Sequence, residues 1–149
     1  MYKTITDTAF REAQKAFGAK EIPVGAVIFN TQTKQIIAKA HNQTLTLSDV
    51  TAHAEIRALQ KACKKLKTTH LQGYSCYTTL EPCAMCAQAL AWAEIDTVLF
   101  GAYDPKSGGV DHNARVLTYA HHQPQVIGGL EEKKGQALLV KFFKELRDE

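Results

Sequence analysis

Apolar residues recur along the chain at helical and strand spacings, and polar turns separate these stretches. Segment 5–17 has apolar side chains at near-helical intervals, and Gly18 follows it as the expected helix C-cap. Two short apolar runs, 23–30 and 35–40, flank a polar turn at 31–34. The chain is therefore predicted to begin with a helix and a β-hairpin.

Three features predict further helices. Segment 51–66 carries apolar side chains on one helical face and lysines on the opposite face, with Thr51 as its expected N-cap. Segment 83–93 is apolar nearly all round, which is typical of a helix buried in the core with Pro82 near its first turn. Segment 131–149 has the pattern of a terminal amphipathic helix.

Strand-forming composition marks three more segments: 74–80, 97–100 and a short last strand within 124–129. Helices that alternate with buried strands are typical of an α/β domain. The expected fold is a three-layer helix/sheet/helix arrangement with a central mixed sheet, and residues 1–149 are expected to form one domain.

Composition narrows the class of protein. The hydrophobic share of 45% with 22% charged residues is typical of a globular domain and excludes global disorder. The N-terminal stretch lacks an apolar signal region, and no apolar run approaches the roughly 18 residues that span a bilayer. A cytoplasmic location without membrane contact is expected, where the four cysteines are reduced or bound to metal. The net charge of +3 is compatible with a nucleic-acid partner without requiring one.

The stretch "TLEPCAMC", residues 79–86, carries two cysteines three positions apart. Such a pair is compatible with a disulfide, a redox pair, a structural zinc site or half of a catalytic metal site. At positions i and i+3 of one helix, both thiolates can reach the same ion. Cys63 and Cys76 lie in an apolar helix face and a strand, which favours core packing over metal binding.

The stretch "TAHAEI" supplies His53 and Glu55 at the start of another predicted helix. One imidazole with the thiolates of Cys83 and Cys86 gives three ligands, which is typical of a catalytic zinc site with an open fourth position. Glu55 can then take a proton from a metal-activated water and return it to a leaving group. Each residue alone would more often be a structural or solvated side chain; together, at this spacing, they favour the catalytic site.

These residues resemble the signature of zinc-dependent deaminases of bases and nucleosides, H-x-E followed by P-C-x-x-C. Here the signature is "HAE" at 53–55 and "PCAMC" at 82–86. Within that superfamily the chain is most similar to bacterial tRNA adenosine deaminases, and the resemblance covers nearly its whole length. The flanking segments that carry it are "IPVGAV" at 22–27, "HN" at 41–42, "FGAYDPKSGG" at 100–109 and "LLVKFFKELR" at 138–147.

The resemblance implies a cytidine deaminase-like fold and a role for each signature residue. His53, Cys83 and Cys86 would hold one Zn²⁺ per subunit, and Glu55 would shuttle protons during hydrolytic deamination. The implied reaction converts the wobble adenosine in a tRNA anticodon loop to inosine.

The resemblance also implies the substrate contacts and the partners. Asn42 would hydrogen-bond the flipped-out base, Val24 and Ala54 would line its pocket, and Asp104 and Lys106 would meet flanking nucleotides. The partners would be a tRNA anticodon stem-loop and a second copy of the chain in a homodimer. The helix containing Phe142 and Phe143 would border the anticodon loop, although core packing explains the two aromatic residues equally well.

Two other functions stay open from the sequence. A free-base deaminase of the same fold, acting on guanine or cytosine, would share the zinc chemistry, because pocket shape selects the substrate. A zinc-stabilised RNA-binding domain without catalysis would use the metal only for structure. The second alternative predicts that Glu55 has no effect on activity.

Overall fold

The five strands form one mixed sheet in the computed structural model, which describes residues 1–149. The strands are β1 (Gly25–Asn30), β2 (Ile36–His41), β3 (Tyr74–Leu80), β4 (Thr97–Ala102) and β5 (Gln125–Ile127). Their order across the sheet is β2-β1-β3-β4-β5. β1 is antiparallel to β2 and to β3, whereas β4 is parallel to β3 and to β5. The prediction of an initial hairpin within a mixed sheet is confirmed.

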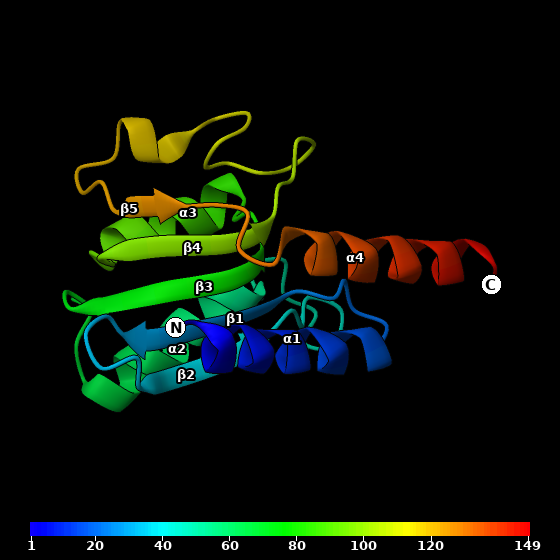
Figure 1. The fold of residues 1–149 in the computed structure, drawn as a ribbon, viewed down its shortest axis with the longest axis horizontal. Coiled ribbons are helices and arrows are strands. Elements are labelled where there is room, and N and C mark those ends of the chain that lie inside the picture. Colours follow the sequence, from blue (N-terminus) through cyan, green and yellow to red (C-terminus); the bar gives the residue numbers. More distant parts are fainter.

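Helices cover both faces of this sheet. They are α1 (Lys3–Gly18), α2 (Ala54–Leu66), α3 (Ala84–Trp92) and α4 (Glu132–Arg147), with a short 3₁₀ turn, η1, at Val116–Thr118. α1 and α4 lie on one face, and α2 and α3 lie on the other (Figure 1). The helix/sheet/helix prediction is confirmed. No helix has the length and apolar content needed to cross a membrane.

Two hydrophobic clusters lie on opposite faces of the sheet, and β1 contributes alternate residues to each. Ala26 and Ile28 belong to the cluster under α2 and α3, whereas Val27 and Phe29 belong to the cluster under α1. This alternation follows from the two-residue period of a strand. Because both faces are covered, the strand is a continuous apolar run.

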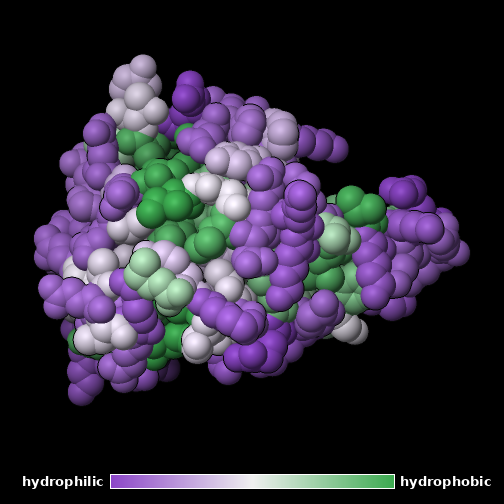
Figure 2. All heavy atoms as spheres, viewed as in Figure 1, coloured by the Kyte–Doolittle hydropathy of each residue, from purple (hydrophilic) through white to green (hydrophobic).

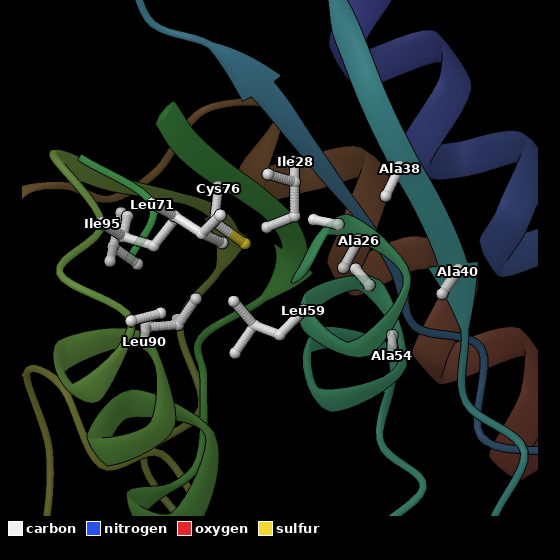
Figure 3. Packing of buried hydrophobic residues seen from close by; sticks show 14 of the residues in the cluster. Ala26, Ile28, Ala38, Ala40, Ala54, Leu59, Leu71, Cys76, Leu90 and Ile95 are labelled. Atoms are coloured by element: carbon white, nitrogen blue, oxygen red, sulfur yellow. The ribbon is translucent and has the colours of Figure 1, made fainter. Parts of the chain in front are cut away.

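The cluster under α2 and α3 joins these two helices to the sheet. Leu59 of α2 and Leu90 of α3 point toward each other, next to Ile28 and Cys76 of the sheet (Figure 3). Cys76 is fully buried there, as the sequence predicted for a core thiol. This packing fixes α2 and α3 relative to one another.

Both predicted helix caps are wrong. Gly18 is the last helical residue of α1, because the N–H of Ala19 still donates to helix carbonyls, and the chain turns at Lys20 (φ 62°). The Thr51 hydroxyl donates to Asp49 Oδ1 at 2.7 Å and does not cap α2. The N-cap of α2 is His53, so the imidazole lies immediately before the helix.

α3 is less buried than its sequence predicted. Cys86, Ala87, Leu90 and Ala91 are buried, but Trp92 is 65% exposed. The Trp92 ring packs against the imidazole of His121, with 4.5 Å between ring centroids, and the rest of its surface faces solvent. An all-apolar pattern did not distinguish the covered face from the open one.

α4 begins close against the sheet and then projects away from it (Figure 1). Gly135 allows the close start: a Cβ at this position would lie 2.8 Å from the carbonyl oxygen of Thr79 and 3.2 Å from Ala102 Cβ. The projecting end is mainly hydrophilic, with a few hydrophobic side chains along it (Figure 2). The first half of α4 therefore has a fixed position beside β3 and β4.

Candidate active site

Three metal-ligand side chains meet where α2 and α3 begin. His53 is the N-cap of α2, Cys83 is the N-cap of α3, and Cys86 lies in the first turn of α3. His53 Nδ1 lies 3.6 Å from Cys83 Sγ and 3.5 Å from Cys86 Sγ. All three donor atoms lie within 4.8 Å of one another. The i, i+3 spacing therefore turns both sulfur atoms toward the same imidazole, as the sequence predicted.

This donor set fits zinc. One imidazole nitrogen and two thiolate sulfurs are ligands that Zn²⁺ prefers, and three protein ligands leave one tetrahedral position open. Cys63 and Cys76 do not belong to the group, which agrees with their predicted place in the core. The arrangement thus resembles a catalytic zinc site more than a closed structural one.

The cluster also favours an ionised thiol. The hydrogen bond from Cys86 is the main cause that lowers the pKa of Cys83 to about 4; burial opposes this effect, and His53 adds to it. The same contact with Cys83, together with burial, raises the pKa of Cys86. The hydrogen bond with Cys83 raises the pKa of His53. Cys83 is therefore held as a thiolate, the form that ligates metals.

Glu55 lies in the first turn of α2, two residues after His53. Its side chain lines the same pocket as His53 and Cys83, yet the residue is only 4% exposed. Burial raises the pKa of its carboxyl to about 7. A carboxyl in this environment is suited to accept and release protons near neutral pH.

A pocket of about 580 Å³ opens in front of these residues, a size typical of small-ligand sites. The structure brings every predicted substrate contact into its lining: Val24, Asn42, Ala54, Asp104 and Lys106. These residues come from segments that are far apart in the sequence. The predicted set therefore forms one continuous surface beside the metal-ligand cluster.

Asn42 is held in place by its neighbours. It is buried at 7% exposure, its Nδ2 donates to the carbonyl of Ile22 at 3.4 Å, and its Oδ1 accepts from the N–H of Thr44 at 3.3 Å. Glu21 supports the same loop, since its buried carboxylate accepts hydrogen bonds from the N–H groups of Leu45 (3.1 Å) and Thr46 (2.7 Å). The Asn42 side of the pocket is thus set by hydrogen bonds around both side chains.

The structure separates the two readings of the C-terminal aromatic pair. Phe142 is 7% exposed and packs edge-on against Phe17 of α1, so core packing accounts for it. Phe143 is 40% exposed and lines the pocket together with Leu139. Core packing is therefore confirmed for Phe142, whereas contact of Phe143 with an anticodon loop stays a prediction.

Sequence reasoning missed several lining residues. Tyr103 and Ser107 fall within the quoted "FGAYDPKSGG" segment but were not singled out, and Thr44, Leu80 and Glu81 were not identified either. The only sign in the sequence that these residues belong to the site was that they lie next to predicted site residues. Only the folded chain shows that they share the pocket.

Residues 1–102 match the family described as the cytidine and deoxycytidylate deaminase zinc-binding region. The chain is 45% identical over 143 residues to a tRNA-specific adenosine deaminase of Aquifex aeolicus, covering 94% of this chain and 92% of that relative.

Two solved structures extend the comparison. One, from work on A-to-I editing by deaminases at the wobble position of transfer RNA, has a TM-score of 0.89 and 40% identity, covering 92% of this chain and 99% of that chain. A guanine deaminase from Bacillus subtilis has a TM-score of 0.63 and 32% identity, covering 83% and 72% respectively. The similarity to the first structure is thus higher in identity, coverage and overall geometry.

Proposed function

The chain belongs to the cytidine and deoxycytidylate deaminase family, whose zinc-binding region it carries, and we propose that it deaminates the wobble adenosine of a tRNA to inosine. The reaction consumes water, replaces the C6 amino group of adenine by a carbonyl oxygen and releases ammonia. The single observation that carries the proposal is the His53–Cys83–Cys86 cluster with buried Glu55 beside it in one pocket. The full-length similarity to tRNA-specific adenosine deaminases supports tRNA as the substrate.

His53, Cys83 and Cys86 would hold one zinc ion per chain. When bound, zinc supplies a Lewis acid that lowers the pKa of water toward 7. Glu55 takes a proton from water, delivers one to adenine N1 as C6 is attacked, and assists the departure of ammonia. Its buried carboxyl, with a pKa raised to about 7, is suited to each of these transfers.

The pocket residues would orient the base and the nucleotides around it. Asn42 offers an amide that can hydrogen-bond a flipped-out base, and Val24 and Ala54 present small apolar walls to it. Asp104 and Lys106 lie in the same lining and would meet the nucleotides that flank the target. Deaminases of this kind bind a flipped-out or single-stranded nucleotide in a fitted pocket, because the target atom is not accessible in a base-paired duplex.

The alternatives have less support. Similarity to a guanine deaminase is lower in identity and coverage than similarity to the tRNA-editing structure. A purely structural zinc site does not account for a buried carboxyl beside the donor cluster in an open pocket. A homodimeric state and a cytoplasmic location remain predictions from the family resemblance and the sequence.

The proposal is tested with zinc-loaded protein and an anticodon stem-loop that carries a wobble adenosine. Free adenosine, guanine and cytosine are tested in parallel, and mass spectrometry detects the exchange of an amino group for oxygen. Inosine in the stem-loop alone is the expected result. Turnover of guanine or cytosine with inert RNA would assign the chain to a free-base branch, and no turnover at all would favour the structural zinc site.

A further inference from the structure

The carboxylate of Glu81 is fully buried and accepts an unusual number of hydrogen bonds. Oε1 accepts from the Asp104 N–H at 3.0 Å and lies 2.8 Å from His112 Nδ1. Oε2 accepts from three consecutive backbone N–H groups: Val110 (3.2 Å), Asp111 (2.9 Å) and His112 (3.2 Å). Every donor belongs to the segment that follows β4.

This segment, residues 103–112, contains no helix or strand and forms one wall of the pocket. Asp104 connects Glu81 to the next residues of the segment, because its Oδ1 accepts hydrogen bonds from the N–H groups of Lys106 (3.2 Å) and Ser107 (3.0 Å). All three of these residues line the pocket. The position of the wall therefore depends on the carboxylate beneath it.

The segment also packs directly on this carboxylate. A Cβ at Gly108 would lie 2.4 Å from Glu81 Oε2, so this position has no space for a side chain. The Gly109 N–H donates to the Pro82 carbonyl at 2.8 Å. Glu81 and Pro82 immediately precede Cys83, so one short stretch holds both a metal-ligand residue and the pocket wall.

We propose that Glu81 is a positioning residue that fixes segment 103–112 relative to the Cys83 end of the pocket and so sets discrimination among nucleotides flanking the target base. The inference rests on the proposed function for its substrate. Glu81 itself does not need to touch the RNA. It acts through Asp104, Lys106 and Ser107, whose backbone it holds in place.

The test compares wild type with Glu81→Gln. An amide has one accepting oxygen and one donating nitrogen, so either orientation of the new side chain leaves one set of N–H donors without an acceptor. Amide hydrogen exchange is expected to accelerate by about tenfold or more in the set that loses its acceptor, which is either Asp104 or the group Val110, Asp111 and His112. The preference in kcat/KM for a cognate stem-loop over one with a changed flanking nucleotide is expected to fall by about tenfold, with zinc content unchanged.

Glu12→Gln is the matched control. Glu12 is also a buried carboxylate paired with a histidine, since its Oε1 lies 3.2 Å from His41 Nδ1, but it does not line the pocket. This variant is expected to keep the exchange of the 103–112 amides and the flanking preference of wild type. A loss of stability alone would affect both variants, so a change in flanking preference is specific to the proposed role.

His112→Gln is the second variant if Glu81→Gln does not fold. It removes the imidazole contact and leaves the four backbone N–H bonds to Glu81, so smaller changes in the same direction are expected. The inference would be overturned if zinc-loaded Glu81→Gln kept the amide exchange and the flanking preference of wild type. If Glu81→Gln does not fold, the same result in His112→Gln would overturn it. Either result would leave the proposed function intact. A wild-type protein inert toward RNA would overturn the proposed function, and the discrimination part of the inference with it.

Discussion

At the scale of single residues, Glu55 carries the chemistry that the proposed reaction demands. It shares the pocket with His53 and Cys83, and 4% exposure keeps its carboxyl away from bulk water. The first turn of α2 holds its backbone two residues after His53, the N-cap of the same helix. Both features suit a proton shuttle, which needs a place beside the reacting groups and a pKa near the working pH; burial raises the pKa of Glu55 to about 7.

Glu55→Gln is expected to retain zinc and lower kcat by about a hundredfold or more, because an amide cannot relay protons. Metal analysis and single-turnover measurement on the stem-loop check the two parts separately. Glu12→Gln is the control, since Glu12 has the same 4% exposure and lies outside the pocket lining. A zinc-loaded Glu55→Gln variant with the full wild-type rate would contradict the assigned role.

At the scale of elements, α4 and the loop after β2 hold two sides of the pocket. α4 brings Leu139 and Phe143 to the lining, and its close approach at Gly135 sets how far they reach. The loop after β2 brings Asn42 and Thr44 to the lining, and hydrogen bonds to the Glu21 carboxylate hold this loop in place. Substitutions at Gly135 or Glu21 are therefore expected to lower the stability of the fold more than they weaken substrate binding.

Gly135→Ala is expected to destabilise the protein by roughly 1–3 kcal/mol, because the new methyl group would lie 2.8 Å from the Thr79 carbonyl oxygen and push α4 outward. Gly18→Ala, the matched change in α1, meets nothing within 4 Å and is expected to be neutral or stabilising by up to about 1 kcal/mol. Urea unfolding measures both. Equal stability of the two variants would contradict the close contact at Gly135.

Glu21 gives the loop after β2 a pH-dependent support. Burial by itself disfavours the charged carboxylate, but hydrogen bonds from Thr46, Leu45 and Thr44 outweigh this effect and hold the pKa of Glu21 below its ordinary value. A lowered folded-state pKa means that the stabilisation is complete above the unfolded-state pKa, about 4.3. It is lost as the pH falls below that value and through the folded-state pKa.

Glu21→Gln is therefore expected to cost about 1–3 kcal/mol at pH 7, with the difference from wild type shrinking as the pH falls below about 4.3. Urea unfolding over a pH series measures this difference. Glu145→Gln, on the exposed part of α4, is the control and is expected to show no such pH-dependent difference. A Glu21→Gln difference that grows toward low pH would reverse the assigned sign.

At the scale of the whole molecule, the donor cluster links two helices of one layer. His53 belongs to the start of α2, whereas Cys83 and Cys86 belong to the start of α3. A metal ion bound by all three therefore ties two chain segments that lie some thirty residues apart. Because the three ligands come together only in the folded chain, metal binding stabilises the folded state.

Removal of zinc by a chelator is expected to lower Tm. Where free zinc is a thousandfold above its Kd, the loss in the free energy of unfolding is about 4 kcal/mol. Cys83→Ser is expected to start at the lower Tm and respond little to the chelator. Cys63→Ser is expected to respond like wild type, because Cys63 lies outside the donor group. An unchanged Tm after verified loss of zinc would contradict a link between the metal and the fold.

The sequence by itself determined the elements and the donor set of this protein. Alternating and helical patterns predicted the helices and strands, because each pattern depends on neighbours within a few residues. The spacing of Cys83 and Cys86 predicted their common direction for the same reason. His53 and Glu55 were found as a metal ligand and a carboxylate at the start of another predicted helix, and the signature shared with known deaminases supported the same set. Helix ends were less accurate, because the Ala19 N–H carries the helical hydrogen bonding past Gly18, and the Thr51 hydroxyl donates to nearby Asp49 instead of capping α2.

Only the tertiary structure decided which residues support the pocket. Glu81 and Glu21 are charged residues that a sequence pattern assigns to the surface, yet both are buried because backbone N–H groups from distant loops converge on them. The different roles of Phe142 and Phe143 likewise depend on how α4 meets α1 and the pocket. Such contacts join residues far apart in the chain, and local spacing carries no record of them.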